Sequence, residues 1–154
     1  VREQIKNGVD AIMIFDTWGG LLSGENYEKF SLNYIQKIIS STYTEGVPVI
    51  YYSRSKSNFD KLKNLDIDCI GISSENNLGD MYKFFDEKFA IQGNLNTDIL
   101  KEDKDTIKKG VIKTLETFPF ETGHVFNLGT GITPDIQPDK VSYLVDQVRE
   151  LSVK

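Results

Sequence analysis

Apolar and polar positions alternate in blocks along this chain, and the blocks predict repeated strand–helix units. Five short apolar runs are typical of strands buried on both faces, at residues 11–15, 47–52, 68–72, 89–92 and 124–128. Between and after them, apolar residues recur at helical spacing over about 27–43, 59–64, 78–86, 103–117 and 139–151. On the first of these helices the stripe consists of Phe30, Tyr34, Ile35, Ile38 and Ile39. A further short helix over residues 1–8, ended by Gly8, precedes the first strand.

This order of elements predicts an α/β fold. Strands separated by helices pair in parallel through right-handed crossovers. Five such units fit either an open doubly wound sheet or part of an eight-stranded (β/α)8 barrel, and the pattern alone does not separate the two. Neither a linker nor a low-complexity segment interrupts the chain, so we expect one continuous domain over residues 1–154. The first helix has no start methionine and no cap before it, which we interpret as the mark of a piece of a longer protein.

Composition narrows the class of protein. The 154 residues carry a net charge of −5, with 39% hydrophobic and 27% charged residues, a balance typical of one soluble globular domain. The acidic balance argues against nucleic-acid binding, and the absence of a long apolar run argues against a membrane span. The single cysteine, Cys69, excludes an internal disulfide and suits a reducing cytoplasm, where we expect the protein to act.

In either architecture a ligand binds at the carboxyl ends of the strands, so the residues that follow each strand are the candidates. They are Asp16, Thr17, Trp18, Ser53, Arg54, Lys56, Ser73, Ser74, Glu75, Gln92, Asn94, Asn127 and Thr130. Asp16 is the best candidate for acid/base chemistry, or else it caps its loop by accepting backbone N–H bonds. For Arg54 and Lys56 the alternatives are that they bind an anionic substrate or that they lie on a solvated loop. For Trp18 the alternatives are that it stacks on a flat ligand or that it is the apolar anchor of its loop.

The glycine turn Gly129-Thr130-Gly131 follows the last strand and lets backbone N–H groups approach a ligand, usually an anion. It lacks the Lys-Ser/Thr of a P-loop and the third glycine of a dinucleotide fingerprint. The only histidine, His124, starts its strand, which favours a structural or surface role. Cys69 lies within a strand and is expected to be a small buried group. One cysteine and one histidine are too few for a metal site, so we expect no bound metal.

Three motifs in order along the chain resemble uroporphyrinogen decarboxylase. The family's Ile-Phe-Asp-Ser-Trp-Ala-Gly-like strand end is present as Ile14-Phe-Asp-Thr-Trp-Gly-Gly20. Its Gln-Gly-Asn-Leu-Asp-Pro-like turn is present as Gln92-Gly-Asn-Leu-Asn-Thr97. Its Asn-Leu-Gly-His-Gly-Ile-x-Pro-like stretch is present as Asn127-Leu-Gly-Thr-Gly-Ile-Thr-Pro134. The resemblance covers essentially the whole chain, and the combination of motifs is specific.

The resemblance implies the C-terminal five of the eight strand–helix units of a TIM barrel. It also implies cofactor-free decarboxylation of the four acetate arms of uroporphyrinogen III to coproporphyrinogen III, in haem synthesis, by a cytoplasmic homodimer. The substrate carboxylates need arginines and the pyrrole N–H groups need a buried carboxylate, and the resemblance places these anchors in a part that this chain lacks. On this basis Thr17, Arg54 and Thr130 are the expected substrate-binding residues, and the isolated chain is expected to be inactive.

The chain also departs from the family pattern. Thr17 stands for a serine and keeps the hydroxyl, whereas Thr130 stands for a histidine and cannot act as an imidazole acid or base. Ser73-Ser74 stand where the family has an Asp-Trp-like pair. Three alternatives therefore remain: a non-catalytic copy that binds a tetrapyrrole or a protein partner, a relative of corrinoid-linked methyltransferases, and an unrelated flavodoxin-like domain. The second would need a His/Cys zinc set at the strand ends. An unrelated flavodoxin-like domain would need a phosphate loop near residue 16.

Overall fold

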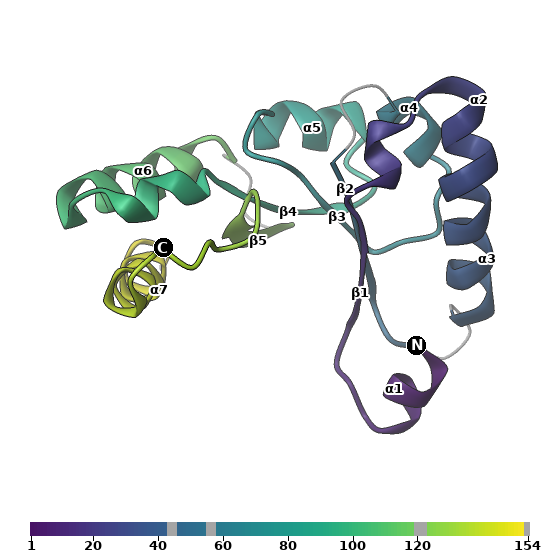
Figure 1. Cartoon of the computed structure of the whole chain (residues 1–154), viewed down its shortest axis with the longest axis horizontal. Helices are drawn as coiled ribbons and strands as arrows, with labels where there is room; N and C mark the ends of the chain where they lie inside the picture. Colours follow the sequence, from purple (N-terminus) through teal and green to yellow (C-terminus); the bar gives the residue numbers. More distant parts are fainter. Residues whose placement is uncertain (43–45, 55–57, 119–122, 153–154) are drawn as a thin grey trace. The chain divides into compact units, whose positions relative to one another are not determined.

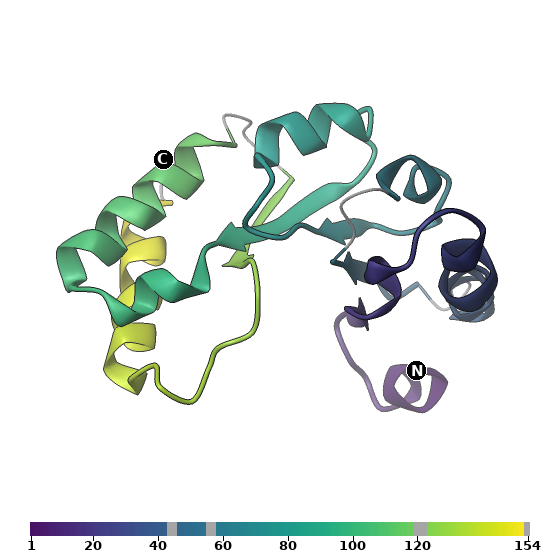
Figure 2. The same cartoon turned by 45° about the horizontal axis from the view of Figure 1, so that its top comes forward.

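The computed structural model describes residues 1–42, 46–54, 58–118 and 123–152, and it divides into two compact units. The first unit comprises Val1–Gly71 with Lys88–Ala90, and the second comprises Ile72–Glu87 with Ile91–Lys154. Figure 1 and Figure 2 show the elements of both units from two directions.

The first unit contains three strands that pair in parallel. Its elements are α1 (Arg2–Lys6), β1 (Ile12–Asp16), η1 (Gly19–Leu21), α2 (Gly24–Tyr27), η2 (Glu28–Leu32), α3 (Asn33–Thr42), β2 (Val49–Ser53), α4 (Phe59–Leu62) and β3 (Cys69–Gly71). Strand β1 pairs with β2, and β2 pairs with β3. Because Asp16 lies opposite Ser53 in the β1–β2 register, both strands end at the same edge of the sheet.

The helical segment after β1 carries two apolar stripes. One stripe is buried and includes Tyr27, Leu32, Ile35 and Ile39. The other consists of Phe30, Tyr34 and Ile38, which follow one another at intervals of four residues and are 60%, 57% and 37% exposed. The prediction of a single stripe was therefore wrong for these three residues. Helical spacing groups residues that share a side of the helix, but it does not say which side has a packing partner.

In its described residues, the second unit contains two parallel strands, three α-helices and the 3-10 helix η4. Its elements are α5 (Leu78–Phe84), β4 (Ala90–Leu95), η4 (Thr97–Lys101), α6 (Lys104–Glu116), β5 (His124–Leu128) and α7 (Pro138–Leu151). Strand β4 pairs with β5, with Ile91 opposite His124 and Leu95 opposite Leu128. The core of this unit is the cluster formed by Leu95, Leu100, Ile107, Val111, Ile136 and Leu144.

The helices of the second unit begin at residues that favour a helix start. The Asp103 carboxylate accepts a 2.7 Å bond from the Thr106 N–H and caps α6. The Asn77 amide oxygen accepts a 3.0 Å bond from the Asp80 N–H and caps α5 in the same way. Helix α7 starts at Pro138, where a missing N–H costs nothing.

The predicted α/β class is confirmed, since all five predicted strands form, alternate with helices and pair in parallel. The predicted burial of the strands was wrong for two of them. Phe15 in β1 is 68% exposed, and Val125 in β5 is 45% exposed. An apolar run identifies a strand, but both faces are buried only where other elements cover both faces. Among the described residues, none of the helices has the length and apolar character needed to cross a membrane.

Candidate functional site

Asp16 forms the centre of a hydrogen-bonded network at the sheet edge of the first unit. The Gly19 N–H donates a 3.0 Å bond to Oδ1 of Asp16. The Tyr51 hydroxyl donates a 2.9 Å bond to Oδ2, and the Ser31 hydroxyl donates to the same oxygen. The carboxylate thus joins β1, the loop that follows it, η2 and β2. This geometry supports the loop-capping interpretation of Asp16, because its carboxylate already accepts three bonds from within the unit.

The network continues from Tyr51 to Tyr27, whose hydroxyl oxygens lie 3.0 Å apart. The single hydroxyl hydrogen of Tyr51 goes to Asp16, so Tyr27 donates to Tyr51. Both tyrosines are completely buried. Burial raises the pKa of Tyr51 above its ordinary value, and the bond with Tyr27 and the nearby Asp16 charge add to this effect. Burial likewise raises the pKa of Tyr27, so both phenols stay protonated.

A hollow of about 330 Å³ opens beside this network in the first unit. It is lined by Asp16, Trp18, Gly19, Leu22, Phe30, Ser31, Tyr34 and Ile35. Trp18 is 77% exposed, so it is not the buried anchor of its loop. With Phe30 and Tyr34 it supplies aromatic faces on which a flat ligand can lie.

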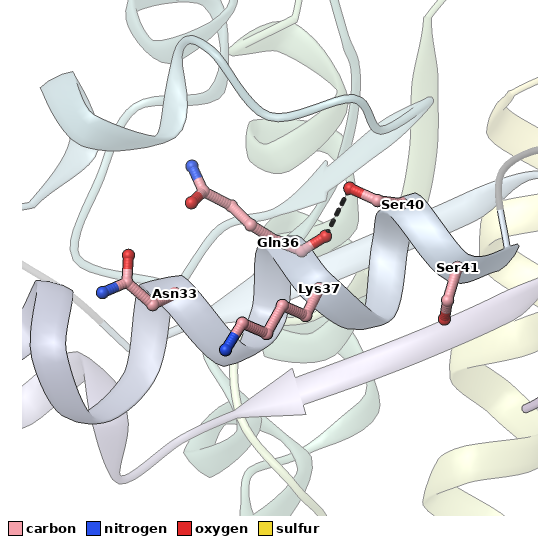
Figure 3. Close-up of a pocket in the computed structure, with 5 residues that line it drawn as sticks. All are labelled: Asn33, Gln36, Lys37, Ser40 and Ser41. Carbon is pink, nitrogen blue, oxygen red and sulfur yellow. Dashed lines mark hydrogen bonds between the residues drawn. The ribbon is translucent and has the colours of Figure 1, made fainter.

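A second, polar hollow of about 540 Å³ lies along α3 (Figure 3). It is lined by Asn33, Gln36, Lys37, Ser40 and Ser41. The Ser40 hydroxyl donates a 2.8 Å bond to the Gln36 carbonyl within the helix. All five residues belong to one helix and none follows a strand, so we do not count this hollow among the candidate sites.

The structure brings Thr17 and Arg54 to neighbouring strand ends. Thr17 follows Asp16 and is half-buried, and Arg54 follows Ser53 and is exposed. Since Asp16 and Ser53 are partners in the parallel register, both residues leave the sheet at the same edge. An exposed guanidinium there can bind an anion. Lys56, the other predicted cation, lies outside the described residues.

One residue that supports this edge was not found from the sequence. Asn58 is 1% exposed, and its side-chain N–H donates a 2.7 Å bond to the Leu22 carbonyl. The amide therefore holds the loop that follows β1. An isolated asparagine in a polar loop carries no sequence pattern that would single it out.

In the second unit, the predicted candidate Asn94 holds a neighbouring loop in place. The Asn94 side-chain amide donates a 2.8 Å bond to the Ser73 carbonyl and a 2.6 Å bond to the Asn76 carbonyl. Both of its hydrogens are thereby used within the fold. Gly129 packs against Ser74 so closely that a Cβ added to Gly129 would overlap the Ser74 backbone nitrogen. The sequence placed Ser74 correctly after its strand, but it was wrong for Asn94, which lies within β4 because that strand runs to Leu95. It also did not reveal that both amide hydrogens of Asn94 are used within the fold.

The glycine turn is bound to the segment that follows β4. The Gly129 N–H donates a 2.8 Å bond to the Leu95 carbonyl. The Thr97 hydroxyl donates a 2.8 Å bond to the Thr130 carbonyl, and the two threonine hydroxyl oxygens lie 2.9 Å apart. Thr130 is exposed, whereas Thr97 is buried. Thr130 and the pair Thr17–Arg54 belong to different units.

His124 is partly buried and Cys69 is buried. The Nε2 of His124 donates a 2.8 Å bond to the Gly93 carbonyl, and burial lowers the pKa of its imidazole. Burial raises the pKa of the Cys69 thiol to about 12, as expected for an inert buried cysteine. Within the part of the chain that the structure describes, no three His, Cys, Asp or Glu side chains form a possible metal site.

Known proteins resemble the chain over nearly its whole length. Residues 1–151 match the family described as Uroporphyrinogen decarboxylase (URO-D). The chain is 39% identical over 155 residues to the uroporphyrinogen decarboxylase of Legionella pneumophila (strain Paris), which covers 99% of the chain and 44% of that protein. It is 36% identical over 159 residues to the enzyme of the same name from Alcanivorax borkumensis, which covers 100% of the chain and 45% of that protein. The chain thus spans less than half the length of these curated relatives.

A solved structure also resembles this one. The methyltransferase from Methanosarcina mazei superposes with a TM-score of 0.78 at 20% sequence identity, over 97% of this chain and 44% of that chain. At this identity the likeness concerns the fold, and it confirms the predicted class, strand–helix units of a (β/α)8 barrel. The relationship inferred from three short motifs therefore extends along the chain: it belongs to the uroporphyrinogen decarboxylase family.

Proposed function

We propose that this chain is part of a uroporphyrinogen decarboxylase, a carboxy-lyase that converts uroporphyrinogen III to coproporphyrinogen III in haem synthesis without a cofactor. The observation that carries the proposal is the family match over residues 1–151, together with 39% identity to a relative of that name. Because the chain spans 44% of that relative, we propose that residues 1–154 form a partial barrel domain and are inactive alone.

Three residues are proposed to contact the substrate. Arg54 is exposed at the end of β2, where its guanidinium can pair with a carboxylate of the tetrapyrrole. Thr17 offers a hydroxyl at the neighbouring strand end. Thr130 offers a further hydroxyl at the glycine turn of the second unit. The complete protein is proposed to act in the cytoplasm as a homodimer. Light scattering of the full-length protein tests the proposed dimer.

The test is formation of coproporphyrinogen by this chain alone and by a chimera. The chimera joins the chain to the part of the Legionella pneumophila enzyme that precedes the matched segment. Products are oxidised and separated by chromatography. We expect product from the chimera and none from the chain alone. Product from the chain alone would contradict its proposed inactivity.

Variants of the chimera test the proposed contacts. Arg54→Gln is expected to raise KM about ten- to one-hundred-fold, since a charge-assisted bond contributes about 1.5–3 kcal/mol. Arg149→Gln removes the same type of charge from the end of α7 and serves as the matched control, with KM unchanged. A KM that stays at the wild-type value in Arg54→Gln would remove Arg54 from the proposed site.

A second function is favoured by the threonine at position 130. Thr130 has no imidazole to offer as acid or base, and its hydroxyl lies 2.9 Å from that of Thr97. A non-catalytic tetrapyrrole-binding protein would retain binding without turnover. A chimera that binds uroporphyrin but releases no coproporphyrinogen would establish this function instead of the first.

A further inference from the structure

Thr97 and Thr130 lie at one edge of the second unit although 33 positions separate them in the sequence. Thr97 begins η4, two residues after β4 ends at Leu95. Thr130 lies two residues after β5 ends at Leu128. Because Leu95 and Leu128 are register partners, the two segments leave the sheet together. Thr97 also stands for the proline of the family's Gln-Gly-Asn-Leu-Asp-Pro-like turn, and Thr130 stands for the histidine of its glycine turn, so these two departures are bonded to each other.

The hydrogens of this pair can be assigned by counting. A threonine hydroxyl has one hydrogen and two lone pairs. The Thr97 hydroxyl donates its hydrogen to the Thr130 carbonyl at 2.8 Å. The 2.9 Å bond between the two hydroxyls therefore takes its hydrogen from Thr130. As a result, the exposed Thr130 oxygen keeps lone pairs for a ligand but has no hydrogen left to donate.

The pair also fixes the backbone of the glycine turn. Thr97 is 4% exposed, so its bonds to Thr130 are protected from water. The Gly129 N–H donates to the Leu95 carbonyl at 2.8 Å and adds a third bond between the same two segments. Gly129 meets the Ser74 backbone on its other side. The turn is thus held against two segments of its own unit.

We propose that Thr97 is a positioning residue that holds the glycine turn and directs the hydroxyl of Thr130, so that Thr130 presents an acceptor to a ligand. That this ligand is the substrate rests on the proposed function, and the group that meets Thr130 must then be a hydrogen-bond donor. The role of Thr97 in the turn does not rest on it. Its test therefore needs no substrate and can fail or succeed independently of decarboxylation.

The test is amide hydrogen exchange of Gly129, measured by NMR on the full chain labelled with ¹⁵N. Thr97→Val keeps the shape of the side chain and removes both hydroxyl bonds. We expect Gly129 exchange to become about five- to tenfold faster, as for the loss of a buried hydrogen bond or two. Thr97→Ser restores the hydroxyl and is expected to exchange within about twofold of wild type. Thr117→Val is the matched control, since it removes a 2.7 Å hydroxyl-to-carbonyl bond to Thr114 elsewhere in the unit.

Thr130→Val tests the direction of the bond between the hydroxyls. It removes only that bond and leaves the Thr97 bond to the Thr130 carbonyl, so we expect an increase of about twofold to threefold. The double variant should match Thr97→Val. Wild-type exchange in Thr97→Val, or no rescue by serine, overturns the positioning role. An effect of Thr130→Val equal to that of Thr97→Val overturns the assigned direction. If Thr97→Val fails to fold, Gly129 exchange in Thr130→Val is compared with that in Thr97→Ser. Faster exchange in Thr130→Val supports the proposal, and equal exchange in the two variants overturns it.

Discussion

Replacing Tyr51 with phenylalanine removes one oxygen from the network around Asp16 and leaves the ring in place. That oxygen donates a 2.9 Å bond to the Asp16 carboxylate and accepts the bond from Tyr27 at 3.0 Å. Both tyrosine side chains are inaccessible to water, so water does not replace either bond. Tyr51→Phe therefore isolates the contribution of one buried hydroxyl.

The expected loss follows from the two bonds. A hydrogen bond to a charged group contributes about 1.5–3 kcal/mol, and a buried donor left without an acceptor costs about 1–3 kcal/mol. Asp16 keeps its bonds from Ser31 and Gly19, which limits the loss at the carboxylate. We expect the free energy of unfolding to fall by about 3 kcal/mol, since the two contributions partly overlap.

Urea unfolding followed by far-UV circular dichroism measures this change. With a slope of about 2 kcal/mol per molar urea, the midpoint of Tyr51→Phe should fall by about 1.5 M. Tyr27→Phe removes only the neutral bond and should cost about 1 kcal/mol. Tyr34→Phe, whose ring is 57% exposed, is the matched control and should stay within about 0.5 kcal/mol of wild type.

The order of the three variants is the critical result. A Tyr51→Phe protein as stable as Tyr34→Phe would refute the network as a source of stability. A loss in Tyr27→Phe equal to that in Tyr51→Phe would show that the hydrogen of Tyr51 does not go to Asp16.

Three further predictions concern stability. Burial lowers the pKa of His124 in the folded state, so the unfolded state takes up a proton first as the pH falls below about 6.5. The urea midpoint of the wild-type protein should therefore decrease between pH 7.5 and pH 5.5. The decrease should be smaller in His124→Gln, which cannot take up this proton. Gly93→Ala should lower the free energy of unfolding by about 3 kcal/mol in the same assay. Gly93 has a φ of +140°, and an added Cβ would lie 2.7 Å from the Ile72 carbonyl oxygen. A Gly93→Ala protein as stable as wild type would contradict this prediction. Asn58→Ala should cost about 1–2 kcal/mol in the same assay, because it removes the buried amide that donates to the Leu22 carbonyl. Exposed Asn64→Ala is the control and should be neutral, and equal losses in the two variants would rule out the anchoring role.

The order of strands and helices could be predicted because it depends on local patterns. Gly8 has a φ of +82° and follows α1, as the sequence indicated. Helix α7 spans Pro138–Leu151, within one residue of the predicted range of 139–151. The strand formed by residues 124–128 begins and ends where its apolar pattern does. These signals depend only on residues that are close together in the sequence, so they can be recognised in a single sequence.

The contacts of the candidate site could not be predicted in the same way. Asp16 was recognised as a candidate, but its bonds from Ser31 and Tyr51 join residues 15 and 35 positions apart. Asn94 was predicted to follow its strand and to be available, yet it lies within β4, and two backbone carbonyls of another loop accept both its side-chain hydrogens. Pairings of this kind depend on how loops meet in three dimensions, which neither periodicity nor spacing encodes.

The exposed indole of Trp18 gives the protein an intrinsic optical reporter. It is the only tryptophan in the sequence, it is 77% exposed, and it lines the hollow beside Asp16. A molecule that displaces water from this hollow should change the wavelength and intensity of the indole emission, and Trp18→Phe should abolish that signal. Titrations of the unmodified protein can therefore report on occupancy of the first unit without a dye or label.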